Sequence, residues 1–280
     1  MTIESAATFE AQGEASFQTT RDGVQQRVRR FIPEGTARAS MVIHHGVGEH
    51  GGRWERSGAL FRDAGFRVIS YDCRGHGETA GRRGYVESFD HFLDDVEDHL
   101  AQARKDGGKA ILLGHSMGGL VAARYAVSDR PQPDLLVLSA PAINAVVPGW
   151  QRTAAPLLSK FLPKVSLATP IERGQLTRDT AVEDKYFADP LVFTSVTTRL
   201  GAEIFTAMDH TRANAHRIRV PTLVVHGGKD VLVATRFSEP LSRIEGVTRK
   251  VYPALLHELF NEPEGPEVIN DVVAWLDPLL

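Results

Sequence analysis

Short apolar segments that alternate with longer amphipathic segments constrain the fold of this 280-residue chain more than any other feature. The apolar segments are 'ASMVIHHG', 'FRVISYDCRG', 'KAILLGHS', 'DLLVLSAP', 'PTLVVHGG' and 'TRKVYPA'. Several are almost entirely apolar, which is typical of strands buried on both faces of a parallel sheet. Strands that alternate with helices require right-handed crossovers, which place helices on both faces of the sheet. The pattern therefore predicts an α/β fold with a mostly parallel sheet.

Two further segments carry clear local signals. The segment 'SFQTTRDGVQQRVRRF' alternates in polarity around Asp22-Gly23, which predicts a β-hairpin. Residues 88–106 have an apolar stripe at helical spacing and are followed by a glycine pair, which predicts an amphipathic helix. The closing segment 'PEVINDVVAWLDPLL' has the same periodicity and predicts another helix.

The alternation stops between about Ile143 and Arg219, where prolines separate short helical pieces and no buried strand is apparent. A structureless loop of this length is uncommon inside a compact domain. We therefore predict that residues 143–219 form a helical cap. The cap would be inserted into an α/β core made of residues 1–142 and 220–280.

Composition excludes several classes of protein. The formal net charge of −3 is unlike that of a nucleic-acid-binding domain, so we expect no nucleic-acid partner. The single cysteine, Cys73, cannot form an internal disulfide, and we expect it to be a small buried residue. The N-terminal residues lack the pattern of a signal peptide, and no run reaches the roughly 18 apolar residues of a spanning helix. We expect a cytoplasmic protein, with peripheral membrane contact still open, and nothing predicts an oligomeric state.

The strongest local motif is Gly114-His115-Ser116-Met117-Gly118, which matches G-x-S-x-G. An apolar strand leads into it and a helical segment rich in small residues follows, as in the nucleophile elbow of hydrolases. Such a turn lifts Ser116 above the sheet edge, and the two glycines avoid side-chain collisions. The backbone N–H of Met117 would lie at a helix N-terminus, where it can stabilise an oxyanion.

A serine nucleophile needs a base, and the base needs an acid that orients it. In this architecture the chain order is serine, then acid, then histidine, each on a loop after a strand. The segment 'TLVVHGGKD' delivers Asp230 and 'RKVYPALLHE' delivers His257, so these are the predicted acid and base.

Other acids and histidines are weaker candidates. Asp209 and Glu203 are the alternative acids, and His210 and His216 fall in or just after the insertion. We expect His226 to pack beside the loop of the acid, and His99 to be solvated on the helix at 88–106.

Taken together, these segments resemble the monoacylglycerol lipase and lysophospholipase branch of the α/β-hydrolase superfamily. The motifs that carry the resemblance are 'HHGVGEHGGRW', 'YDCRGHGETAGRRGYVESFDHFLDDV', 'LLGHSMGGLVA', 'LVLSAPA', 'PTLVVHGGKD' and 'YPALLHELFNEPE'. The similarity is greatest to bacterial monoacylglycerol lipases. It implies the α/β-hydrolase fold, with a mostly parallel eight-stranded sheet flanked by helices and a helical cap. It also implies a catalytic triad of Ser116, Asp230 and His257, with no cofactor and no metal.

The resemblance extends to the surroundings of the triad. It implies that the N–H of Val47 is the second oxyanion donor beside that of Met117. It also implies that Glu49 and Arg53 lie near the alcohol end of the substrate. Some relatives have a second histidine three residues after the catalytic one, whereas this chain has Phe260 there. The polar end of the site is therefore expected to be built differently.

The implied function is hydrolysis of a lipid ester, with monoacylglycerol cleaved to glycerol and fatty acid through an acyl-enzyme on Ser116. The alternatives are a lysophospholipase, a general short- or medium-chain carboxylesterase, and a serine aminopeptidase. A peptidase would need acidic residues such as Glu172, Glu183 and Asp184 to hold a substrate amine, although surface charge is the simpler role for each. A non-catalytic binding protein of the same fold is the remote alternative.

Within the predicted cap, Leu157, Leu158, Phe161 and Leu162 share one helical face. This face could pack onto the core, line an acyl tunnel, or contact a membrane surface transiently.

The three histidines of 'HHGVGEHGGRW' raise the question of a metal site. Adjacent residues of a strand point to opposite faces, so His44 and His45 cannot easily share a metal. We expect His45 to brace the loop and His50 to lie just behind the site. The most important group of this loop is then the backbone N–H of Val47, the implied oxyanion donor.

Overall fold

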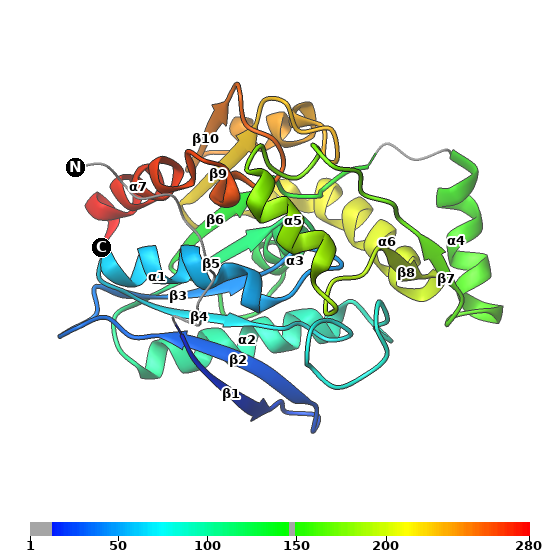
Figure 1. Ribbon diagram of the computed structural model, residues 1–280, viewed down its shortest axis with the longest axis horizontal. Coiled ribbons are helices and arrows are strands. Elements are labelled where there is room, and N and C mark those ends of the chain that lie inside the picture. The colour runs from blue at the N-terminus through cyan, green and yellow to red at the C-terminus, as the bar shows by residue number, and fades with distance from the viewer. Residues whose placement is uncertain (1–12, 146–148) are drawn as a thin grey trace.

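Eight strands form one sheet at the centre of the structure (Figure 1). The computed structural model describes residues 13–145 and 149–280, so residues 1–12 and the part of the predicted cap at 146–148 lie outside it. In spatial order the strands are β1 (Glu14–Thr19), β2 (Gln25–Phe31), β4 (Phe66–Tyr71), β3 (Ala39–His44), β5 (Lys109–His115), β6 (Leu135–Ser139), β9 (Thr222–Gly227) and β10 (Val247–Tyr252). Among the described strands of this sheet, only the β1–β2 and β2–β4 pairs are antiparallel, which confirms the predicted hairpin and the mostly parallel sheet.

Helices cover both faces of this sheet because successive residues of each buried strand point in opposite directions. In β5, Ile111 and Leu113 join the core beneath α1 and α7, whereas Leu112 joins the core beneath α2 and α3. The covering helices and 3₁₀ turns are α1 (Glu55–Asp63), α2 (Asp90–Lys105), α3 (Met117–Ala126), α7 (Gly265–Leu276), η1 (Gly51–Trp54), η2 (Ala215–Arg217), η3 (Thr235–Arg243), η4 (Leu259–Asn261) and η5 (Asp277–Leu279). The α/β-hydrolase fold is confirmed, and α2 and α7 match the predicted helices.

The insertion between β6 and β9 holds helices and a short two-stranded ribbon. Its elements are α4 (Gly149–Phe161), β7 (Ser166–Ala168), α5 (Thr180–Ala188), β8 (Ser195–Thr197) and α6 (Thr198–Asn214). α6 packs on α3 of the core, and α4 packs on α6. Figure 1 shows α4 as the part of the insertion farthest from the sheet.

The apolar face of α4 points to solvent. Phe161 is 76% exposed and Leu157 is 60% exposed, and Leu158 and Leu162 are also exposed. The alternative in which this face packs onto the core is therefore wrong. Sequence periodicity identifies an apolar face, but it does not tell which neighbour covers it.

The expectation that His99 is solvated is also wrong. Its side chain is fully buried, its ring stacks on Tyr71 at 4.1 Å, and its Nε2 lies 2.7 Å from Oε1 of Gln26. The buried face of α2 is wider than the apolar stripe, because the helix also covers polar side chains of β2. Burial lowers the pKa of His99 to about 3.

This buried histidine predicts a loss of stability in acid. In the unfolded chain a histidine binds a proton below about pH 6.5, whereas folded His99 stays neutral down to about pH 3. Between these values the unfolded state binds more protons, so stability falls as the pH falls. Replacing His99 with Gln, which can still donate to Gln26, is expected to reduce the loss of unfolding free energy between pH 7 and pH 5 by about 2 kcal/mol. Urea denaturation at pH 7 and pH 5 measures the unfolding free energy of each protein.

The matched control is His91→Gln on the same helix, where the side chain is only half-buried. The control is expected to follow the parent protein. Equal pH dependence for the His99→Gln variant and the parent would contradict this account.

Candidate active site

Ser116 occupies a strained turn between β5 and α3. Its backbone has φ 55° and ψ −116°, a region that L-residues rarely adopt and that costs about 1–3 kcal/mol. Hydrogen bonds hold the turn on both sides: the N–H of Ser116 donates to the carbonyl of Ser139, and its carbonyl accepts from Leu120 and Ala142. The strand, the helix and the neighbouring strand β6 together hold the serine in this conformation.

The glycines of the motif are required by close packing in this turn. A Cβ atom on Gly114 would lie 2.2 Å from the carbonyl oxygen of Gly118, which no side chain could tolerate. The turn can therefore close only because Gly114 has no side chain.

Asp230 and His257 form a buried hydrogen-bonded pair. Asp230 follows β9 and His257 follows β10, and Nδ1 of His257 lies 2.7 Å from Oδ2 of Asp230. The other carboxylate oxygen accepts the N–H groups of Leu232 and Val233 at 2.9 and 2.8 Å. Nε2 of His226 lies 3.2 Å from Oδ2 of Asp230, so His226 packs beside the acid as predicted.

These contacts shift the titration of both groups. Burial opposes ionisation of Asp230, but the charge of His257 and hydrogen bonds from His226 and His257 hold the pKa of the carboxyl well below its usual range. Burial alone would lower the pKa of His257, yet the Asp230 carboxylate raises it above its usual value, with smaller contributions from Glu258 and Glu49. The pair therefore stabilises a protonated imidazole.

The loop after β3 lies directly against the serine. A Cβ atom on Gly46 would be 3.2 Å from Cβ of Ser116, so this backbone passes beside the nucleophile candidate. The N–H of Gly46 donates to Oε1 of Glu49 at 2.5 Å, and Val47 and Met117 both line the adjacent cavity. This arrangement brings the two predicted oxyanion donors to the same cavity as Ser116.

The histidines after β3 hold this loop in place. Nε2 of His45 accepts the N–H of Cys73 at 2.9 Å, so Nδ1 carries the ring proton and donates to the carbonyl of Gly46 at 2.7 Å. His50 reaches the insertion, with Nε2 2.8 Å from Oδ2 of Asp189. Within residues 13–145 and 149–280, no group of three or more histidine, cysteine or acidic side chains is placed to hold a metal ion.

A buried cluster of charges lies beside the histidine. Arg53 donates two hydrogen bonds to Glu258, at 2.5 and 2.7 Å, and one to Glu49 at 3.1 Å. Its guanidinium also lies over the ring of Tyr186, 4.6 Å from the centroid. Burial opposes ionisation of Glu258, but Arg53 holds the pKa of this carboxyl below its usual range. Burial raises the pKa of Glu49 above its usual range, against the opposing charge of Arg53.

Sequence reasoning missed Glu258. The residue directly follows His257, and this adjacency was the only signal that could have identified it. Glu49 and Glu258 line the cavity, whereas Arg53 lies outside the lining residues. Phe260, which stands where some relatives have a second histidine, packs its ring against Trp54 and Phe61 instead.

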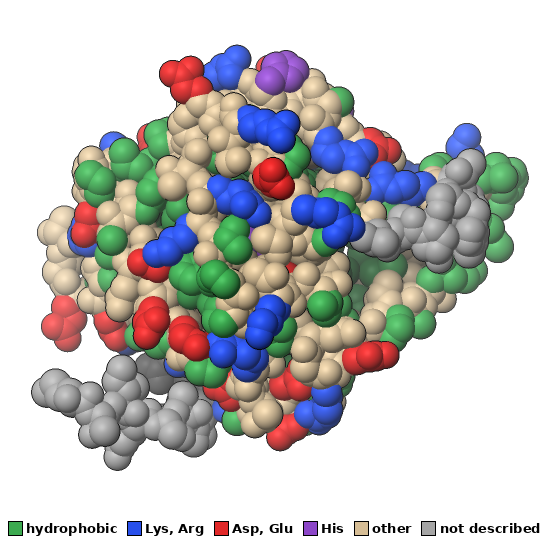
Figure 2. All heavy atoms as spheres, turned by 90° about the horizontal axis from the view of Figure 1, so that it is seen from above, with side chains coloured by type: hydrophobic (Ala, Val, Ile, Leu, Met, Phe, Trp, Pro, Cys, Tyr) green, Lys and Arg blue, Asp and Glu red, His purple; other side chains and the backbone are tan. Residues whose placement is uncertain are grey.

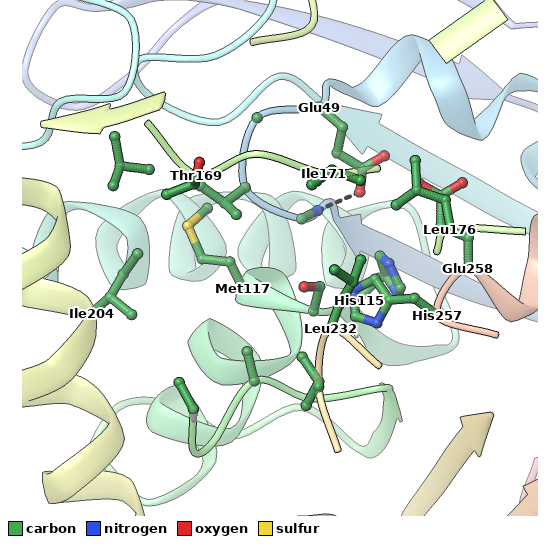
Figure 3. A pocket seen from close by; sticks show the side chains of 18 of the residues that line it. Glu49, His115, Met117, Thr169, Ile171, Leu176, Ile204, Leu232, His257 and Glu258 are labelled. Atoms are coloured by element: carbon green, nitrogen blue, oxygen red, sulfur yellow. Dashed lines mark hydrogen bonds between the residues drawn. The ribbon is translucent and has the colours of Figure 1, made fainter. Parts of the chain in front are cut away.

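The cavity in front of Ser116 has a volume of about 420 Å³, and most of its lining residues are apolar. Figure 3 shows Ile204 and Met117 on one side, and Glu49 and Glu258 toward the other. The lining also includes Phe193, Val196 and Met208. A molecule with an apolar tail and a polar head matches this division.

The alternative acids and bases lie away from this cavity. Asp209 is exposed and pairs with Arg152 at 2.9 Å, and Glu203 accepts the N–H of Phe89 at 2.8 Å. His210 and His216 are not among the lining residues either.

The acidic residues of the insertion also lie outside the cavity lining. Glu172 and Asp184 are exposed, as expected for surface charges. The same expectation is wrong for Glu183, which is buried and accepts the N–H of Gly174 at 2.6 Å. Glu183 closes a local turn of the chain.

This chain is similar to several known proteins. The monoacylglycerol lipase of Mycolicibacterium smegmatis is 35% identical over 261 residues, covering 88% of this chain and 90% of that protein. The phospholipase YtpA of Bacillus subtilis is 30% identical, covering 85% and 95%. The crystal structure of Paleococcus ferrophilus monoacylglycerol lipase superposes with a TM-score of 0.83 at 29% identity, covering 90% and 98%.

The match to a family model identifies the chain more broadly. The model of the serine aminopeptidase (S33) family matches residues 35–264, which is most of the chain. The fold, the elbow and the relatives agree with that match, and the predicted resemblance is confirmed. This protein belongs to the serine aminopeptidase (S33) family of α/β-hydrolases.

Proposed function

We propose that this protein is a serine ester hydrolase that cleaves monoacylglycerol to glycerol and a fatty acid. One observation carries the proposal. The 2.7 Å bond between His257 and Asp230 lies at the same cavity as Ser116, which sits on a strained turn between strand and helix. Nucleophilic catalysis by serine requires this combination of groups.

The mechanism assigns one role to each group. Ser116 attacks the ester carbonyl while His257 accepts its proton, and Asp230 orients the imidazole and stabilises its charged form. The N–H groups of Val47 and Met117 stabilise the tetrahedral oxyanion, each contributing about 3 kcal/mol. The alcohol leaves with the proton from His257, and water then releases the fatty acid from the acyl-enzyme.

The division of the cavity supports the substrate class. The side with Ile204 and Met117 suits an acyl chain, and the side with Glu49 and Glu258 suits the hydroxyl groups of glycerol. The names of the Mycolicibacterium and Paleococcus relatives support the same choice. The phospholipase relative keeps lysophospholipid as the alternative substrate.

Replacing Ser116 with Ala is expected to lower kcat for a monoacylglycerol by a factor of about 10⁴–10⁶, because the acyl-enzyme can no longer form. Fatty-acid release measures the rate, and covalent labelling by a fluorophosphonate tests the nucleophile separately. Full activity in the variant would contradict the mechanism. A parent protein that is neither labelled nor active on simple esters would favour a binding protein of the same fold.

The pH profile tests the base. His257 acts when neutral, and its raised pKa keeps it protonated to a higher pH than an ordinary histidine. The kcat/KM for a p-nitrophenyl ester is therefore expected to fall with decreasing pH through a pKa above about 6.5. Asp230→Asn is expected to lower kcat by roughly 10⁴, because the imidazole loses its orientation and its stabilising charge.

The control for this experiment is Asp209→Asn, which changes an exposed acid away from the cavity. It is expected to leave the rate and the profile unchanged. If Asp209→Asn lowers kcat as much as Asp230→Asn does, the assignment of Asp230 as the acid is contradicted.

We further propose that α4 contacts the membrane surface from which the substrate comes. Its described exposed apolar side chains include Leu157, Leu158 and Phe161, exposed Leu162 follows directly after the helix, and none of these residues lines the cavity. Figure 2 shows hydrophobic side chains gathered at the end of the molecule that carries α4. Lys160 and Lys164 are exposed beside them, so the surface suits anionic lipid. No helix of residues 13–145 and 149–280 is long and apolar enough to cross a bilayer.

Phe161→Asp is expected to weaken binding to vesicles that contain anionic lipid by at least about tenfold. The variant loses the burial of a large apolar side chain and gains a repelled charge. Co-sedimentation measures binding. The control is Phe17→Asp, which alters an exposed aromatic side chain on β1. Equal binding by all three proteins, or no binding by the parent, would contradict membrane contact through α4.

A further inference from the structure

The polar side of the cavity presents the carboxyl groups of Glu49 and Glu258, and the described lining residues include neither lysine nor arginine. Two histidines line the same cavity. His115 is buried, and burial lowers its pKa to about 3, so it is neutral at physiological pH. His257 has a raised pKa, but it must be neutral to act as the base. Burial raises the pKa of Glu49, whereas Arg53 keeps Glu258 ionised, so a substrate head group meets hydrogen-bond acceptors and the negative charge of Glu258.

The nearest arginine does not reverse this charge. Arg53 is buried and directs its guanidinium at Glu258 through two hydrogen bonds and at Glu49 through a third. The face of the guanidinium is covered by the ring of Tyr186. The guanidinium is therefore paired with the two glutamates, and Arg53 is not among the residues that line the cavity.

From this arrangement we infer that Glu258 determines the charge selectivity of the head-group site. By binding Arg53 it keeps the guanidinium away from substrate, so the site accepts neutral alcohols that donate hydroxyl hydrogens and rejects head groups that carry phosphate. The inference rests on the proposed function and specifies the substrate class of the same site.

The physical basis is that a carboxylate accepts a hydrogen bond from a hydroxyl group but repels an anion. An ionised carboxylate has about four acceptor positions. Oε2 of Glu258 uses part of this capacity for Arg53 and for Nδ2 of Asn261 at 2.9 Å. A hydroxyl group can donate to the remaining positions, whereas a phosphate cannot and is repelled by like charge.

The first experiment uses the unaltered protein and two substrates that differ by one phosphate group. The kcat/KM is measured for 1-decanoylglycerol and for its 3-phosphate, both below the concentration at which micelles form. We expect the neutral ester to be preferred by at least about tenfold, the effect of one uncompensated charge at this range. Equal rates, or preference for the phosphate ester, would overturn the inference while leaving an ester hydrolase.

A different result identifies failure of the proposed function. If p-nitrophenyl decanoate is hydrolysed but neither glycerol ester is, monoacylglycerol is not the substrate, and the inference falls with it. If the neutral ester is hydrolysed well, the proposed function stands whatever the variants do.

The second experiment removes the charge that holds Arg53. In Glu258→Gln the guanidinium keeps only Glu49 as an ionic partner, so the site becomes less negative by one charge. The ratio of kcat/KM for the phosphate ester to that for the neutral ester is expected to rise about tenfold. The matched control is Glu78→Gln, because Glu78 also pairs with arginine, 3.1 Å from Arg27, but is not part of the cavity lining. An unchanged ratio in Glu258→Gln would overturn the inference.

A conservative variant separates charge from packing. Glu258→Asp keeps the negative charge but shortens the side chain by one methylene group. The substrate ratio of Glu258→Asp is expected to stay within about twofold of the parent. A shift as large as that of Glu258→Gln would attribute the selectivity to shape and overturn the inference. Fluorophosphonate labelling confirms that each variant folds, and if Glu258→Gln does not fold, the parent and Glu258→Asp decide.

Discussion

Parallel strand pairing is the constraint on which the rest of this structure depends. The neighbours β4, β3, β5, β6, β9 and β10 are all paired in parallel, so the loops that follow them meet at one edge of the sheet. Ser116, Asp230 and His257 follow β5, β9 and β10, and each is held by its own strand end. Residues far apart in the chain come together because the parallel register places the ends of their strands at the same edge of the sheet.

This edge of the sheet holds both the strained backbone of Ser116 and the buried charged cluster beside His257. The left-handed backbone of Ser116 persists because β6 accepts its N–H and α3 begins directly after it. The buried Arg53 is tolerated because Glu49 and Glu258 neutralise it through well-formed hydrogen bonds. The same cluster connects the loop after β3 to the loop after β10. The position of the proposed oxyanion donors and the position of the proposed base are therefore linked through one guanidinium.

The insertion contributes the remaining walls of the site. Ile204 and Met208 of α6 line the cavity, and the N–H of Phe193 donates to the carbonyl of Gly48. His50 and Asp189 add a second connection between the loop after β3 and the insertion. The described exposed apolar side chains of α4 are not among the residues that line the cavity, whereas α5, α6 and Phe193 all contribute to its lining.

The sequence by itself determined the fold, the elbow and the candidate triad, because each has a local signature. Apolar runs identify buried strands, glycines at 114 and 118 identify a tight turn, and strand ends identify where Asp230 and His257 must lie. The tertiary structure decided which faces are covered and which charges meet. The burial of His99, the exposure of Phe161 and the pairing of Arg53 with Glu258 all depend on packing between segments distant in the chain. Periodicity and turn chemistry act over a few residues, and such contacts leave no signal at that range.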